Sequence, residues 1–212
     1  MSQQAAAFAA FAVVAALLTM TPGVDSMLVL RTAAVAGGRT AMLAGFGVIT
    51  GLLCWGLAAG VGLAAVLAAS ETAYTVLRLA GAAYLGWLGV RRLIRASRGP
   101  QPATDGVPAA TVGRGRAYSQ GLVTNLLNPK IGVFYVTLLP QFVIAGQPVL
   151  LVTFGLALVH AAEGVLWFVA VSWLAGRIGA LLRRRRARRV LDATTGTVFL
   201  GFAARLALDG GR

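Results

Sequence analysis

The residues Asn128-Pro129-Lys130 interrupt the apolar stretch 121–143, which reads GLVTNLLNPKIGVFYVTLLPQFV. About 20 residues at ~1.5 Å of rise each are enough for a helix to cross a bilayer. A polar residue, a proline and a cation at that depth are energetically expensive, so such groups usually face a cavity or a partner. A second interruption, Thr21-Pro22-Gly23-Val24-Asp25, has the same character. We expect the chain to be organised around these two breaks.

The composition predicts a membrane protein. Of the 212 residues, 58% are hydrophobic and 12% are charged, and the mean hydropathy is +0.80. A water-soluble domain of this length would carry far more charge. Several apolar runs exceed ~18 residues, as transmembrane helices do. We therefore predict an all-α integral membrane protein.

Six transmembrane helices are expected. The first apolar run continues almost to residue 36, so a bend at Pro22-Gly23 is needed to fit it into one crossing. No Lys or Arg precedes Arg31, so the first helix is not expected to be a signal peptide. The expected spans are 5–30, 41–69, 73–94, 119–140, 147–175 and 190–208.

The net charge of +13 would indicate nucleic-acid binding in a soluble chain. Here the arginines cluster at the ends of apolar runs, where they orient the protein in the membrane. The positive-inside rule then predicts that both termini lie outside and that three basic loops lie in the cytoplasm. Those loops hold 15 of the 19 basic residues: Arg31, Arg39, Arg91, Arg92, Arg95, Arg98, Arg114, Arg116, Arg177, Arg183, Arg184, Arg185, Arg186, Arg188 and Arg189.

The chain is expected to form one transmembrane domain, 1–212, built from two halves. A Gly- and Pro-rich linker, 97–118, separates a first three-helix half, 1–96, from a second, 119–212. Three spans per half make the halves enter the membrane in opposite directions. The stretches 81–86 and 196–201 resemble each other, as do the two proline breaks. This pattern predicts two inverted repeats, typical of secondary transporters; chance similarity of apolar sequence is the alternative.

Each break is expected to begin a half-helix. Thr21 and Asn128 are suitable N-caps, and Pro22 and Pro129 suit the first helical position. The N–H groups at such a start attract anions, for example a substrate carboxylate. The alternative is a proline kink without a ligand.

Asp25 and Lys130 place a charge beside each break. Intramembrane charges are usually functional, so the pair is expected to bind opposite ends of a zwitterion, or Asp25 to carry a proton. Alternatively, Asp25 favours the dipole of its own helix, and Lys130 snorkels or pairs with Asp25.

His160, Glu163 and Trp167 are spaced to share one stripe of the fifth span. A carboxylate and a histidine on one stripe form a candidate proton relay, in which we favour Glu163. The alternative, which we favour for His160 alone, is a polar contact that locks this span to a neighbour.

The second span carries two glycine pairs, Gly47 with Gly51 and Gly56 with Gly60. At 100° per residue the pairs lie on nearly opposite faces, so close packing is expected on both sides.

Chemistry other than transport has little support. Motifs of metalloproteases, serine hydrolases and phosphate-binding loops are absent, so neither an enzyme nor a cofactor is expected. The single cysteine, Cys54, and the single histidine fit no metal pattern.

Two blocks of sequence stand out. They are Pro22-Gly23-Val24-Asp25 with Gly37-Gly38-Arg39, Gly45 and Gly51, and Asn128-Pro129-Lys130-Ile131-Gly132-Val133-Phe134 with Leu139-Pro140-Gln141-Phe142-Val143. Together they resemble the lysine-exporter (LysE/RhtB) family, and the resemblance covers nearly the whole chain. An N-P-K followed ten residues later by P-Q-F is the more specific signature. Val24 is a departure, because the family often has a second proline there.

The resemblance implies a proton-driven exporter of amino acids or related zwitterions in the bacterial inner (plasma) membrane, with homo-oligomers as an option. A divalent-metal exporter and a non-transporting scaffold are the alternatives. Expected substrate-binding residues are Pro22, Gly23, Asp25, Asn128, Pro129 and Lys130, and expected proton-coupling residues are Asp25, Glu163 and His160.

Overall fold

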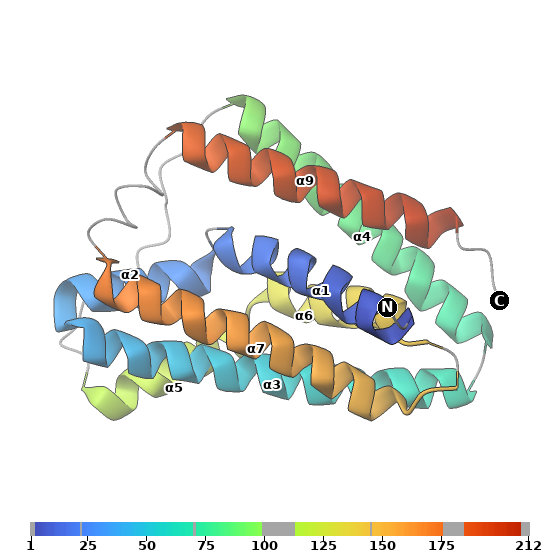
Figure 1. Cartoon of the computed structure of the whole chain (residues 1–212), viewed down its shortest axis with the longest axis horizontal. Helices are drawn as coiled ribbons and strands as arrows, with labels where there is room; N and C mark the ends of the chain where they lie inside the picture. Colours follow the sequence, from blue (N-terminus) through green and yellow to red (C-terminus); the bar gives the residue numbers. More distant parts are fainter. Residues whose placement is uncertain are drawn as a thin grey trace.

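A computed structural model describes residues 3–21, 23–69, 71–98, 113–144, 146–175 and 185–208. Within these ranges the chain is helical and contains no strand, which confirms the all-α prediction for this part of the protein. The helices are α1 (Gln3–Met20), α2 (Val24–Ala36), α3 (Gly38–Ala69), α4 (Glu71–Arg98), α5 (Arg114–Leu126), α6 (Pro129–Leu138), the 3₁₀ helix η1 (Leu139–Phe142), α7 (Val149–Trp173) and α9 (Arg185–Leu208) (Figure 1).

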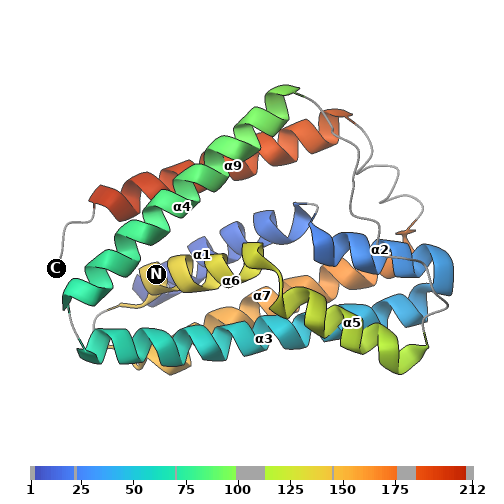
Figure 2. The ribbon, with the colours of Figure 1, turned by 180° about the vertical axis from the view of Figure 1, so that it is seen from behind.

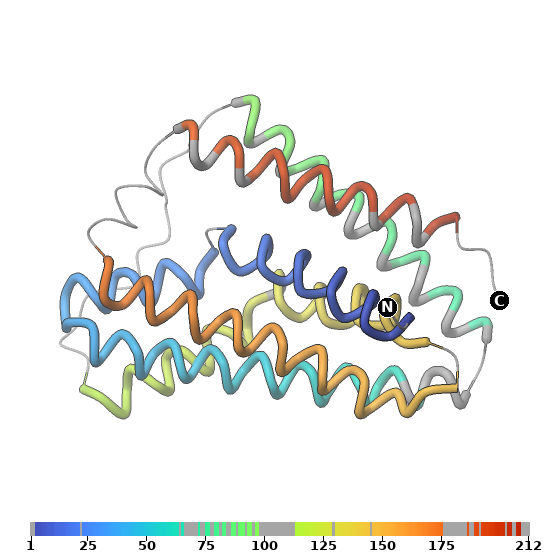
Figure 3. The backbone as a smooth tube through the Cα atoms, in the orientation of Figure 1, coloured from blue at the N-terminus to red at the C-terminus, as the bar shows by residue number. Residues whose placement is uncertain are grey.

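Two of the expected spans are broken helices. The first consists of α1 and α2, which are separated by residues 21–23, although Pro22 itself lies outside the described residues. The fourth consists of α5 and α6, which are separated by Leu127 and Asn128 and bent by 52° across the break. Figure 3 shows the backbone of the helices on either side of each break. The predicted positions of the interruptions are therefore confirmed.

Length and composition fit a bilayer for part of the predicted set. Among the described residues, α1, the segment Gly38–Leu63 of α3, and α7 are long and apolar enough to cross a membrane. The bent pair of α5 and α6 is a fourth candidate. Helices α4 and α9 are not among them, and arginines occupy the last turns of α4 and the first turns of α9.

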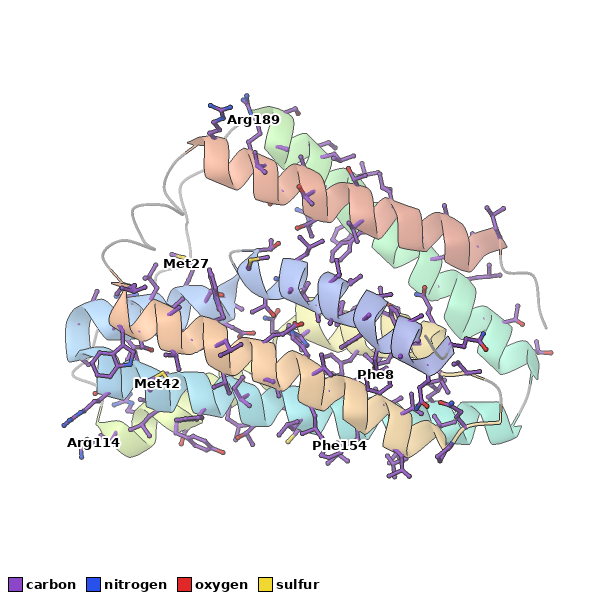
Figure 4. All side chains as sticks on the ribbon, in the orientation of Figure 1. Phe8, Met27, Met42, Arg114, Phe154 and Arg189 are labelled. Atoms are coloured by element: carbon purple, nitrogen blue, oxygen red, sulfur yellow. The ribbon has the colours of Figure 1, made fainter. Side chains whose placement is uncertain are left out.

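Helix α3 lies at the centre of the main bundle. It packs against α5, α7 and α2, while α1 packs mainly on α7. Helices α4 and α9 pack along each other and form a separate layer, which contacts the bundle through α6, α3 and α1 (Figures 1 and 2). The start of α1 and the end of α9 lie toward the same end of the molecule. Arg114 and Arg189, at the starts of α5 and α9, lie toward the opposite end (Figure 4).

Glycines allow α3 to approach both neighbours closely. A Cβ atom added at Gly47 or Gly51 would clash with α5, and one added at Gly56 or Gly60 would clash with α7. On α5, a Cβ at Gly121 would overlap the backbone of α3. The prediction that α3 is tightly packed on two faces is confirmed, since these contacts leave no room for a methyl group.

An aromatic cluster joins α1, α6 and α7 beside the breaks. The Phe11 ring lies 6.0 Å from that of Phe134 and 5.3 Å from that of Phe142. The His160 ring of α7 stacks on Tyr135 with centroids 5.7 Å apart. These buried rings hold the two helix breaks at fixed positions relative to α7.

Candidate functional site

A cleft of about 380 Å³, counting its open mouth, lies where the two breaks meet. The end of α1, the starts of α2 and α6, and the middle of α3 and α7 contribute to its wall. Its polar lining includes Thr21, Gly23, Asp25, Asn128, Lys130 and His160. The fold thus brings five of the predicted site residues to one place, from helices far apart in sequence.

Asp25 is the second residue of α2, and its side chain is only 8% exposed. Its Oδ2 atom accepts hydrogen bonds from Nδ2 of Asn125, at 2.9 Å, and Nδ2 of Asn128, at 3.0 Å. Its Oδ1 atom is buried and has no hydrogen-bond partner among the described residues. The two oxygens of this carboxylate therefore differ, because two amides hold one of them and no described group holds the other.

Lys130 is the second residue of α6, and its amine reaches back to the end of α1. Nζ donates to the carbonyl oxygens of Leu18, at 2.9 Å, and Thr21, at 3.3 Å. The last carbonyls of a helix have no partner within it and carry its negative dipole end, so a cation stabilises them. Nζ also lies beside Gly23, at 3.5 Å from the position that a Cβ atom would take there.

Each charged side chain therefore makes its contacts at the break of the other half-helix. Asp25, in the first turn of α2, contacts Asn125 and Asn128 at the second break. Lys130, in the first turn of α6, contacts the backbone at the first break. The start of α2 is thus hydrogen-bonded to residues at the second break, and the start of α6 to residues at the first.

The predicted caps are confirmed at one break and wrong at the other. Asn128 is the N-cap of α6, with Oδ1 accepting from the Lys130 N–H at 3.1 Å, and Pro129 takes the first helical position. At the first break Gly23 is the N-cap, without a side-chain hydrogen bond. Thr21 instead donates to the Leu17 carbonyl at 2.6 Å. Its hydroxyl contacts the end of α1, and Thr21 lies two residues before the N-cap position of α2.

Thr21 also joins this break to the outer layer. Its Oγ1 lies 2.8 Å from Oγ1 of Thr195 on α9, and both residues are buried. The contact links α9 to the wall of the cleft.

His160 lies in the cleft wall with both ring nitrogens occupied. Nδ1 is 3.1 Å from the hydroxyl of Tyr135, and Nε2 is 3.1 Å from Oγ1 of Thr19. The side chain is 2% exposed. This geometry matches the polar contact that we favoured for His160, since the residue joins α7 to α1 and α6.

Glu163 is half-buried one turn further along α7, and it is not among the residues that line the cleft. Its Oε2 atom is buried without a hydrogen-bond partner in the described part of the chain. No hydrogen bond joins it to His160 among the described contacts, and Trp167 of the same stripe donates to Ser26 at 3.1 Å. The structure therefore does not bring the predicted relay into one chain of contacts.

Sequence reasoning missed Asn125, which is completely buried and holds Asp25. The available signal was its spacing, because a polar residue three positions before Asn128 lies on nearly the same face of the span. Ser26 was also missed, although it follows Asp25 directly and lines the cleft. A serine in the first turn of a helix is too common to stand out.

No group of three or more His, Cys, Asp or Glu side chains within the described ranges is placed to bind a metal ion. Cys54 is exposed on the outer surface of α3.

Comparison with known proteins identifies relatives over almost the full length. The LysE type translocator family model matches residues 16–210. The homoserine/homoserine lactone efflux protein of Salmonella typhimurium is 32% identical over 199 residues, which cover 93% of this chain and 94% of that protein. The threonine efflux protein of Escherichia coli K12 is 26% identical over 203 residues, covering 95% and 98%. The membrane protein YrhP of Bacillus subtilis is 28% identical over 205 residues, covering 94% and 98%.

No solved structure matches this chain. The family match spans most of the sequence and includes both breaks and the cleft between them. The chain therefore belongs to the LysE type translocator family.

Proposed function

We propose that this protein exports amino acids or related small zwitterions across the bacterial inner membrane, with the cleft between the two breaks as its binding site. The observation that carries the proposal is that a carboxylate and a cation line the same cleft. The carboxylate is that of Asp25, whose Oδ1 has no hydrogen-bond partner among the described residues, and the cation is Lys130. The efflux activities named for the Salmonella and Escherichia relatives support the same substrate class.

The two ends of an amino acid fit the two sides of this cleft. The ammonium group would donate to Oδ1 of Asp25, which lacks a partner among the described residues. The carboxylate would lie at the start of α2, where Gly23 provides no side-chain cap and the first N–H groups have no partner inside the helix. The Lys130 amine beside Gly23 adds a positive charge at the same point.

The proposal includes proton antiport, in which amino-acid export is coupled to proton entry. The Oδ1 atom of Asp25 can hold a proton or the substrate ammonium, but not both, so binding of one would release the other. Glu163 is the second candidate, because its buried Oε2 lacks a partner in the described part of the chain. His160 has both nitrogens occupied and would act only if those contacts break. Unchanged proton dependence in Glu163→Gln would remove Glu163 from the mechanism.

The proposed architecture is six spans in two inverted halves. It is supported by a broken helix at the start of each half, and by the packing of α3 against α7 and of α4 against α9, the pairs that a two-fold axis in the membrane would relate. Most of the proposed linker, residues 99–112, lies outside the described residues. Both termini outside is the orientation that the arginine distribution favours. Homo-oligomer formation remains a prediction.

The test is efflux from proteoliposomes that contain the purified protein. Vesicles loaded with a mixture of labelled amino acids would be exposed to an imposed pH gradient. Gradient-dependent loss of one group of amino acids would support the proposal and identify that group. Retention of every amino acid, with intact helices shown by circular dichroism, would overturn it. Metal ions would then be tested next.

A further inference from the structure

Beyond the two charged residues, we propose that Ser26, held in place by Trp167, determines specificity by recognising a hydroxyl group on the substrate's side chain. The inference rests on the proposed function and concerns the same cleft. It assigns the site to neutral amino acids whose short side chain carries a hydroxyl.

The first step concerns charge. Among the residues that line the cleft, Asp25 and Lys130 are the acidic and basic ones. Both are engaged by the ammonium and carboxylate groups that every amino acid carries. A lysine or glutamate side chain would then enter a wall without an opposite charge, which is unfavourable in a buried site. The cleft is therefore suited to a neutral side chain.

The second step concerns the remaining polar groups of the wall, most of which are occupied. The Thr21 hydroxyl donates to Leu17, both ring nitrogens of His160 have partners, and the Asn128 amide uses both its oxygen and its nitrogen. Thr19 shares its hydroxyl with His160.

Ser26 and Trp167 form a hydrogen bond whose direction is fixed, whereas the direction of the bond between Thr19 and His160 depends on the histidine tautomer. The Oγ of Ser26 accepts a hydrogen bond from Nε1 of Trp167 at 3.1 Å, and its own proton reaches no acceptor among the described residues. The side chain is 5% exposed and lines the cleft one residue after Asp25. Because an indole N–H only donates, Trp167 fixes the serine oxygen as an acceptor and leaves its O–H as a donor. A substrate hydroxyl oxygen is the complementary acceptor.

The third step concerns size. The cleft is also lined by buried apolar side chains, among them Val48, Leu52 and Phe168. These side chains come from α3 and α7, which approach closely through glycines and have little room to separate. The space therefore suits a short side chain.

The experiment compares homoserine with 2-aminobutyrate, its analogue without the hydroxyl, as competing labelled substrates in proteoliposomes. The wild-type protein is expected to favour homoserine. Ser26→Ala should lower that preference about threefold to tenfold, the effect of one neutral hydrogen bond, while 2-aminobutyrate efflux persists. Ser26→Thr keeps the hydroxyl and should keep the preference. Trp167→Phe should lower it by less, because the serine hydroxyl then rotates.

Ser172→Ala is the matched control. Ser172 is a buried serine on α7 that does not line the cleft, so its loss should leave the preference unchanged. An unchanged preference in Ser26→Ala, equal efflux of both substrates by the wild type, or efflux of lysine or glutamate would overturn the inference. If Ser26→Ala fails to insert into the membrane, the test is made with the other two variants. A lower homoserine preference in Trp167→Phe and an unchanged one in Ser26→Thr would support the inference, and the absence of this difference would overturn it. If the wild type exports no amino acid, the proposed function fails as well, which is a distinct result.

Discussion

At both helix breaks the helix ends leave backbone N–H and C=O groups without partners inside the helix, and the two breaks satisfy these groups differently. At the second break the solution is local: the Asn128 side chain caps α6, and the Leu127 N–H closes the last turn of α5 on Val123. At the first break the Thr21 N–H closes the last turn of α1 on Leu17 in the same way, but the Leu18 carbonyl depends on Lys130 and the start of α2 has no side-chain cap. The second break is thus a rigid support. The first is incomplete by itself, and that is where a ligand can add hydrogen bonds.

The largest effect should follow from removing the charge at the first break. Asp25→Asn keeps the shape but leaves no counter-charge for the substrate ammonium. Loss of one partner from a buried charge pair costs about 2–5 kcal/mol, so efflux should fall more than roughly thirtyfold. The measurement is the initial rate of amino-acid efflux from proteoliposomes. Normal efflux by Asp25→Asn would place the substrate site elsewhere.

The next effect should follow from removing the cation. Lys130→Met takes a charged donor from the Leu18 and Thr21 carbonyls and from the proposed carboxylate site. A hydrogen bond from a charged group contributes about 1.5–3 kcal/mol. Both efflux and the melting temperature in detergent should therefore fall. Lys130→Arg is the control that retains the charge. A stable, active Lys130→Met protein would show that the first break needs no help from α6.

Asn128→Ala tests the local support of the second break. It removes an N-cap, worth about 0.5–2 kcal/mol, together with one of two hydrogen bonds to Asp25. Asn125→Ala removes the other hydrogen bond to Asp25 and no cap. Asn128→Ala should therefore lower the thermal stability in detergent more than Asn125→Ala. The opposite order would mean that the cap matters less than the burial of Asn125.

The smallest effect is expected at the contact between the first break and α9. Thr21→Val removes the hydrogen bonds to Thr195 and Leu17 with little change in volume, at about 0.5–1.5 kcal/mol. Thr195→Val removes only the first. Both variants should stay folded, and their efflux rates should differ from the wild type by less than tenfold. A complete loss of transport in Thr195→Val would give α9 a larger role than the breaks themselves.

Much of this organisation could be predicted from the amino-acid sequence. Prolines and charges inside apolar runs mark the breaks, because a bilayer makes such residues expensive wherever they have no role. The α3 glycines at spacings of four indicated its two packed faces, and helices lie within about five residues of the bounds predicted for five of the six ranges. The cap at Asn128 followed from local chemistry alone.

The misses share one cause, which is that they depend on neighbours distant in the chain. Judged from the neighbouring sequence, the Thr21 hydroxyl is a suitable N-cap. In the structure it is instead hydrogen-bonded to the Leu17 carbonyl of α1 and to Thr195 of α9. Likewise, the stripe of His160, Glu163 and Trp167 is real on α7, but each side chain meets a different environment once α1, α2 and α6 pack around it.

The sequence by itself determined that the chain is helical, that it belongs in a membrane, and that two of its helices are interrupted, since these follow from apolar run length and from the rigidity of proline. Only the tertiary structure decided that the charge of each half-helix serves the opposite break, that Asn125 completes the carboxylate's contacts, and that Glu163 lies outside the cleft wall. The reason is physical: local chemistry determines where a helix starts and stops, whereas the partner of a buried charge is set by which distant segments the packing brings within hydrogen-bond distance.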